Sequence, residues 1–278
     1  MRTERDHDEG WALISVLWVV LMLSMMAAAT QALMVTSSRI EGRAYDRAKS
    51  SAAFEASIAR AVLGISDPRI EKRWRVDGAS EAFSFDGAAI RVSVQAELGR
   101  FDLNVMDGSM LRQLLQSAGL TDRDAENMAD RILDWRSTTD LEHLRGATDV
   151  DYAAAGLPYR QRHGEFQSVA ELQMVLGMTP DLYARIRPAL TVYTHRSMID
   201  PEVATPAALA ALNFNNIAPP EAQTPQSHPG VLDPNLPLGG QAFSVTVQSS
   251  EGHGVSTRRA VVELTGDPER PYIILAWE

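Results

Sequence analysis

The chain of 278 residues contains no cysteine, which excludes disulfide scaffolds, thiolate metal sites and cysteine nucleophiles. Basic residues are outnumbered, because 26 Lys and Arg stand against 36 Asp and Glu and the net charge is −10. This acidic balance argues against a function that neutralises nucleic-acid phosphates over a broad surface. Since 45% of the residues are apolar, the chain can bury the cores of about two folded units.

Catalytic motifs are missing as well. The six histidines are scattered along the chain, and no metalloprotease pair, nucleophile elbow, phosphate-binding loop or dinucleotide fingerprint is present. The sequence therefore predicts that the chain is not an enzyme.

A long apolar run begins close to the N-terminus. No charged residue occurs between Glu9 and Arg39, and residues 11–35 exceed the stretch of about 20 apolar residues that crosses a bilayer. We predict a membrane span. The alternative is a secretory signal peptide that is cut behind the alanines at residues 27–29, although the run is longer than the usual apolar region of about 7–15 residues. Helical spacing continues beyond the run, so a single helix is expected over residues 12–63.

Strand patterns lie on both sides of a helical middle section. Residues 82–85 and 90–95 are separated by Asp86-Gly87, which is typical of a hairpin turn. Three further strands are expected near the C-terminus, at residues 243–248, 259–264 and 272–277. The Pro- and Gly-rich segment 213–241 that precedes them is interpreted as a linker and not as packed structure.

The middle section has the pattern of two helix-turn-helix units. Their turns are expected at Gly119 and Gly177, where positive φ suits glycine. Threonine N-caps are predicted two residues after each glycine, at Thr121 and Thr179, and a third helix start at Thr205. Ser168 is the candidate N-cap of the helix that precedes Gly177.

Carboxylates gather in the segment between the two units. A loop rich in hard oxygen ligands is a candidate calcium site, although the spacing is not that of an EF-hand and a solvated acidic loop is the alternative. No other cofactor is expected. The candidate ligands are Asp134, Asp140, Glu142, Asp149 and Asp151.

Several motifs together resemble the minor pseudopilin K family of the type II secretion system. A short hydrophilic leader ends in Gly10 and is followed by WALISVLW, which is similar to the start of that family. The most specific similarity lies between the two turns, in ILDWR, DVDY, GLPY and FQSVAEL, with LTVY after the second turn.

The resemblance implies an α+β fold with a pilin-like long N-terminal helix on a small antiparallel sheet. A large all-α lobe with helix-hairpin-helix (SAM-like) units would be inserted into it. The implied divisions are a prepilin leader (1–10), the transmembrane half of the helix (11–35), the rest of the helix with the first strands (36–100), the lobe (101–212), the linker (213–241) and the C-terminal strands (242–278).

The resemblance also implies cleavage between Gly10 and Trp11 by a prepilin peptidase. Ser15 then occupies position five of the mature chain, where most pilin-like subunits carry a Glu that pairs with the neighbouring subunit's N-terminal ammonium. K-type subunits lack this Glu. A subunit at the end of a stack has no neighbour above it, and an unpaired buried carboxylate is costly, so Ser15 suits a tip position.

The implied function is a minor pseudopilin that caps the periplasmic pseudopilus and helps to initiate its assembly for protein export. Its implied partners are the minor pseudopilins I, J and H, and its implied location is the inner membrane, with a single span and most of the chain in the periplasm. A membrane-anchored, competence-type DNA receptor with helix-hairpin-helix units is the alternative. The acidic balance disfavours it, and no nucleic-acid partner is expected.

Overall fold

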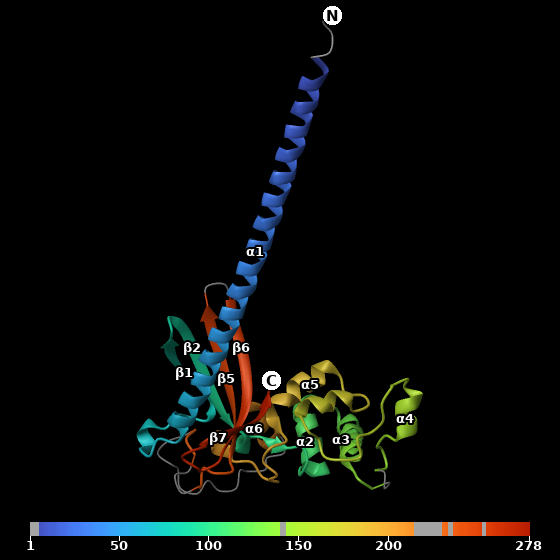
Figure 1. Cartoon of the computed structure of the whole chain (residues 1–278). Helices are drawn as coiled ribbons and strands as arrows, with labels where there is room; N and C mark the ends of the chain where they lie inside the picture. The colour runs from blue at the N-terminus through green and yellow to red at the C-terminus, as the bar shows by residue number, and fades with distance from the viewer. Residues whose placement is uncertain (1–5, 140–142, 214–229, 233–235, 252–253) are drawn as a thin grey trace, which may run out of the picture. The chain divides into compact units, whose positions relative to one another are not determined.

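The computed structural model describes residues 6–139, 143–213, 230–232, 236–251 and 254–278. The chain divides into two compact units, Met1–Glu55 and Ala56–Glu278. The predicted long helix is confirmed as α1 (Asp6–Ile65), which continues from the first unit into the second (Figure 1). The second unit also holds an antiparallel sheet and a helical lobe, which carry all of the side-chain clusters described below.

The sheet has five strands in the order β1-β2-β5-β6-β7, and every neighbouring pair is antiparallel. Val92 lies opposite Val247 and Val94 opposite Val245, so the alternating apolar residues of β2 and β5 form one buried face. All five strands were predicted, β7 with the observed bounds and the other four with shorter ones. Their observed bounds are β1 (Asp77–Phe85), β2 (Ala88–Ala96), β5 (Ala242–Glu251), β6 (Gly254–Leu264) and β7 (Tyr272–Trp277).

The last turns of α1 belong to the second unit. Their apolar side chains recur at helical spacing and form one buried face of the helix. Ile58, Ala61, Val62 and Ile65 are all buried. The Arg60 guanidinium lies 5.2 Å from the ring centre of Phe83 on the edge strand β1 and 5.9 Å from that of Trp74. This end of the helix is therefore tied to the β1 side of the sheet.

The lobe contains most of the short helices of the second unit. Its largest helices, α2 (Gly108–Ser117) and α3 (Asp122–Arg136), pack against each other around a core of aliphatic and aromatic side chains. The remaining lobe helices are α4 (Asp149–Ala154), η3 (Val169–Met174), α5 (Pro180–Ile186), η4 (Arg187–Ala189), η5 (Pro201–Val203) and α6 (Pro206–Asn213). Two 3-10 turns lie outside it, η1 (Ile70–Lys72) and η2 (Glu97–Gly99).

Three expectations for this unit are wrong. The lobe is not purely helical, because β3 (Phe101–Asp102) at its start pairs in parallel with β4 (Leu190–Thr191). The helix after Ser168 is the 3-10 helix η3, and the Ser168 side chain does not cap it. The segment predicted as an unpacked linker is partly packed, since Val231 and Leu232 are buried. Residues 214–229 of that segment lie outside the described residues.

Candidate functional site

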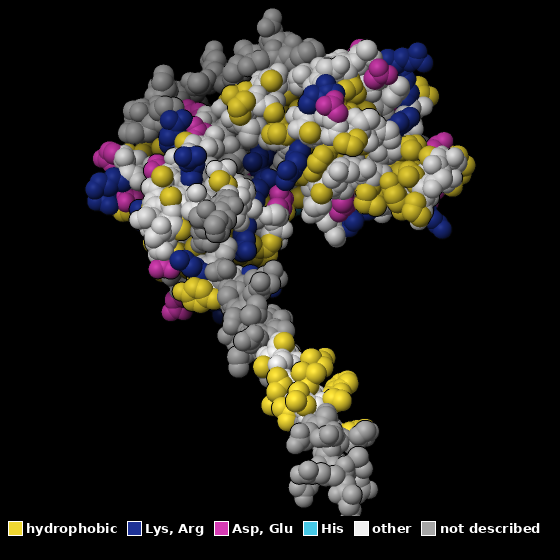
Figure 2. Space-filling model, turned by 90° about the horizontal axis from the view of Figure 1, so that it is seen from above, with side chains coloured by type: hydrophobic (Ala, Val, Ile, Leu, Met, Phe, Trp, Pro, Cys, Tyr) yellow, Lys and Arg dark blue, Asp and Glu magenta, His cyan; other side chains and the backbone are white. Residues whose placement is uncertain are grey.

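The predicted leader junction and membrane run lie on α1. Gly10 and Trp11 are both helical, and the side chains described between residues 11 and 29 are exposed on all faces of the helix (Figure 2). The side chains of residues 12 and 30–35 lie outside the described part. Within the described part, no helix meets the length and hydropathy that a membrane crossing requires. Ser15 is exposed among these apolar neighbours.

The two predicted glycine turns have the backbone geometry that their sequences require. Gly119 has φ of 96° and Gly177 has φ of 88°, a region that side chains other than hydrogen disfavour. Thr121 caps α3 by accepting a hydrogen bond from the backbone N–H of Asp124, and Thr179 caps α5 by accepting one from that of Leu182. The turns and both threonine caps are therefore as the sequence predicted.

Two arginines join the turns reciprocally. Arg131 lies on α3, which follows the first turn, and its Nη1 donates to the carbonyl oxygen of Leu176 in the second turn at 3.0 Å. Arg185 lies on α5, which follows the second turn, and its Nη1 donates to the carbonyl oxygen of Ala118 in the first turn. An ideal Cβ at Gly177 would lie 2.5 Å from Arg131 Nη1, so a side chain there would displace the guanidinium from its present position.

These contacts disfavour phosphate binding at the turns. The Thr121 hydroxyl satisfies a backbone N–H at the start of α3 and itself donates to the carboxylate of Asp124 at 2.7 Å. Asp122 also lies in that first turn of the helix. A phosphate would therefore meet carboxylates instead of free N–H groups, which argues against the DNA-receptor alternative.

An aromatic cluster lies behind the second turn. Trp135, Tyr152, Tyr159 and Phe166 have ring centres 5.8–6.4 Å apart. Burial raises the pKa of Tyr152 to about 12, and the oxygen of its neutral phenol accepts the backbone N–H of Leu176 at 3.0 Å. The cluster thus reaches the second turn through Tyr152, while its rings pack against one another in the core of the lobe.

A buried carboxylate joins the first residues of the lobe to the segment that follows β4. Asp102 accepts three hydrogen bonds at Oδ2, from the backbone N–H groups of Thr194 and His195 and from the Thr194 hydroxyl. Its Oδ1 accepts the backbone N–H of Asn104 at 2.8 Å. Asn104 in turn exchanges two side-chain hydrogen bonds with the backbone of Phe166. This role of Asp102 was missed in the sequence, because Thr194 and His195 lie about 90 residues away.

A second set of missed residues joins the lobe to the sheet. Glu97 is buried and pairs with Arg100 at 2.7 Å, and Arg259 on β6 lies 3.9 Å from the same carboxylate. Glu278 pairs with Arg259 at 3.1 Å and with Arg187 of the lobe at 2.9 Å. Burial lowers the pKa of Arg259, although the two nearby carboxylates favour its charged form. Each partner in this arginine–glutamate network has an opposite charge within reach, so removing one of them would leave an unpaired charge at the junction.

The predicted calcium ligands are brought together only in part. Asp140 and Glu142 lie outside the described residues. The side chain of Asp149 accepts the backbone N–H of Gln161, and that of Asp151 completes a capping box with Thr148 at the start of α4. Within the described part of the chain, no three acidic or histidine side chains form a group that could hold a metal ion.

Asp134 differs from the other candidate ligands. It is buried, and its Oδ1 accepts from the backbone N–H of His143 at 3.1 Å and lies 2.6 Å from His143 Nδ1. Its Oδ2 is buried with no hydrogen-bond partner among the described residues. Such an oxygen fits the role of a cation ligand, because a buried carboxylate oxygen without a partner is costly.

Comparisons with known proteins agree with the motifs. Residues 99–195 match the family model of type II secretion system protein K. The curated protein of that name from Pectobacterium carotovorum is 33% identical over 79 residues, which is 28% of this chain and 24% of the relative. The one from Pseudomonas aeruginosa is 26% identical over 137 residues, which is 46% of this chain and 41% of the relative. These matches thus span less than half of the relatives' length.

A solved structure extends the similarity to the fold. The fold resembles that of a chain in the crystal structure of the GspK-GspI-GspJ complex from the type 2 secretion system of enterotoxigenic Escherichia coli. The TM-score is 0.59 at 16% identity, and the likeness covers 86% of this chain and 98% of that chain. The fold is a mixed one, with helices and an antiparallel sheet. Residues 99–195 match the type II secretion system protein K family, which confirms the resemblance found in the sequence.

Proposed function

We propose that the chain is a minor pseudopilin of the type II secretion system. It caps the tip of the periplasmic pseudopilus and helps to initiate its assembly with the minor pseudopilins I, J and H. It thereby supports export of folded proteins across the outer membrane as a structural subunit and not as an enzyme. The observation that carries the proposal is the match of residues 99–195 to protein K. The likeness to a chain solved in a GspK-GspI-GspJ complex adds support.

The N-terminal helix supplies the assembly contacts in this proposal. It is anchored in the inner membrane, and most of the chain lies in the periplasm. The apolar side chains exposed along residues 11–29 are favourable against lipid and against the helices of sister subunits, and unfavourable against water. Ser15 places no carboxylate in this apolar surface, which suits a subunit with no neighbour above it.

Complex formation tests the proposal directly. The detergent-solubilised full-length chain is mixed with the I and J subunits of the same organism and separated by size-exclusion chromatography. We expect one stable complex that contains all three proteins and binds no duplex DNA at low salt. Separate elution of the three proteins would contradict the proposal, and DNA binding with a steep salt dependence would favour the receptor alternative.

Processing of the leader gives a separate prediction. Replacing Gly10 by Leu should leave residues 1–10 attached, because the proposed prepilin peptidase cuts after this glycine. Intact mass and N-terminal sequencing of the membrane-derived protein measure the outcome. Ala29→Leu is the control: it should be processed normally at Trp11, whereas the signal-peptide alternative predicts that this change blocks processing. Normal processing of Gly10→Leu would contradict the proposed cleavage site.

Calcium binding at the acidic loop is a further part of the proposal, with Asp134 as a ligand. A ligand that binds only the folded state adds about 2.7 kcal/mol to stability at 100 times its dissociation constant. Chelation by EGTA should therefore lower the melting temperature of the full-length chain by several degrees, and added Ca²⁺ should restore it. Asp134→Asn should be insensitive to the chelator. An unchanged melting curve of the unmodified chain would exclude a stabilising calcium ion.

A further inference from the structure

The two edge strands of the five-stranded sheet differ in how well they are protected against pairing with a strand of another chain. The edge strand β1 contains Glu81, two serines and a glycine, and its register shifts between Asp77 and Ser80. Charged residues and irregular register are the usual protection of an exposed edge. The opposite edge strand β7 has the sequence YIILAW, with no charged residue, and among the described residues it pairs only with β6.

The apolar side chains of β7 are exposed on both of its faces. Ile274 lies opposite Val262 on the face that buries the sheet core, yet it is 36% exposed. Ile273, on the other face opposite Glu263, is 46% exposed, and Leu275 is 37% exposed. Arg60 ties the end of α1 to the far side of the sheet, at β1. The apolar surface of β7 therefore extends beyond the part of the sheet that this helix end covers.

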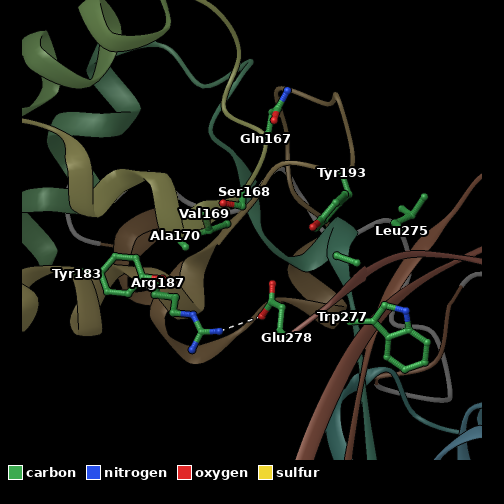
Figure 3. Close-up of a pocket in the computed structure, with 11 residues that line it drawn as sticks. Gln167, Ser168, Val169, Ala170, Tyr183, Arg187, Tyr193, Leu275, Trp277 and Glu278 are labelled. Atoms are coloured by element: carbon green, nitrogen blue, oxygen red, sulfur yellow. Dashed lines mark hydrogen bonds and ion pairs between the residues drawn. The ribbon is translucent and has the colours of Figure 1, made fainter. Parts of the chain in front are cut away.

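A groove of about 430 Å³ runs between β7 and the lobe. One wall consists of residues 275–278, and the other includes Ser168, Val169 and Tyr193 of the lobe (Figure 3). Arg187 reaches across the groove to Glu278. A segment that paired with the outer edge of β7 would enter this groove at its end.

The charged residues that line the groove are Arg187 and Glu278, and the network behind them adds two arginines and one glutamate. Arg187 and Arg259, with Arg100 behind them, face the carboxylates of Glu97 and Glu278, so three cations are joined to two anions. Figure 2 shows Lys and Arg side chains gathered in the hollow between sheet and lobe. This excess stands out in a chain whose net charge is −10. The Arg187 side chain is 45% exposed, and a guanidinium has donors beyond those that one carboxylate occupies.

We propose that β7 and this groove bind an extended strand of another pseudopilin subunit, one that carries an acidic side chain. The strand adds to the sheet as a sixth member, its apolar residues cover Ile273, Ile274 and Leu275, and its carboxylate meets Arg187. This inference rests on the proposed function, since it names the surface on which the I–J pair is bound.

A second copy of this chain fits the surface less well. The strand β7 contains no acidic residue that could meet Arg187 of a partner copy. Two chains of net charge −10 also repel each other at low salt. The occupant is therefore a different subunit.

Charge substitutions at Leu275 test the inference. The full-length chain in detergent is titrated with the purified I–J complex, and dissociation constants are measured by biolayer interferometry. Leu275→Lys removes an apolar contact and should weaken binding about tenfold, as the loss of one interface anchor does. Leu275→Glu should weaken it by a further factor of about ten, because it also repels the acidic strand. The same substitutions at Val255, which is 69% exposed on β6 of the same sheet, are matched controls and should leave binding unchanged.

The outcomes separate the inference from the proposed function. If the unmodified chain does not bind the I–J complex, the proposed function fails. If it binds and the Leu275 variants bind equally well, or no worse than the Val255 variants, the surface is wrong while the function stands. If light scattering shows that the Leu275 variants lose self-association and keep I–J binding, the occupant is a second copy and the inference is overturned. Circular dichroism and melting curves must match the unmodified chain.

Discussion

Replacing Gly99 by alanine is expected to lower the free energy of unfolding by at least about 3 kcal/mol. Gly99 ends the 3-10 turn η2, where the backbone passes directly against residues 203–204. An added Cβ would lie 2.7 Å from the carbonyl carbon of Val203 and 2.9 Å from Cα of Ala204. Backbone atoms cannot move aside as the end of a flexible side chain can, so the cost exceeds ordinary overpacking of about 1–3 kcal/mol.

Urea denaturation of the full-length chain, followed by circular dichroism, measures the effect of the Gly99 change. Gly164→Ala is the matched control, because its Cβ would meet no atom within 4 Å and its backbone lies outside the left-handed region. This control should remain within about 0.5 kcal/mol of the unmodified chain. Equal stability of both variants would show that the approach of η2 to residues 203–204 is not as close as described.

The second large effect is expected at Asp102. Asp102→Ala removes the acceptor of four hydrogen bonds and leaves the N–H groups of Asn104, Thr194 and His195 without their partner. Hydrogen bonds to charged groups contribute about 1.5–3 kcal/mol each, and buried donors that lose their acceptor add a desolvation cost. We expect a loss of about 3–5 kcal/mol in the free energy of unfolding.

Two further variants distinguish the loss of these hydrogen bonds at Asp102 from the effect of removing any negative charge from the chain. Asp102→Asn keeps one acceptor oxygen and should lose about half as much stability as the alanine variant. Asp181→Ala removes a carboxylate whose side chain is 82% exposed and pairs only with Arg185 among the described residues, so its cost should stay below about 1 kcal/mol. A cost at Asp102 no larger than at Asp181 would rule out its organising role.

Periodic features of the fold were predictable from the sequence, and features that depend on distant partners were not. The alternation in β2 and β5 and the apolar spacing in α3 repeat over several residues, so each pattern identifies its element. The strands β3 and β4 have two residues each and carry no period. The 3-10 form of η3 also has no signature, because Val169, Leu172 and Val175 suit either kind of helix.

In the candidate site, too, local features were predictable and features that depend on distant partners were not. The turns at Gly119 and Gly177 were predictable because φ at a glycine depends on neighbours in the chain. The arginine–glutamate network was not, since Glu97 and Arg259 are 162 positions apart and either charge alone reads as a solvated surface residue. The exposure of β7 could not be predicted from the sequence either, because a run of apolar residues such as YIILAW is also typical of a buried strand.

The reciprocal arginines couple the folding of the two halves of the lobe. Arg131 and Arg185 each donate to the turn of the other half, so both of these hydrogen bonds are lost when either half is missing. Truncations that divide the lobe between residues 137 and 168 should yield two insoluble fragments, whereas coexpression of both pieces should recover them as one non-covalent particle. Hydrogen exchange should likewise release both turns in the same opening event and at the same rate.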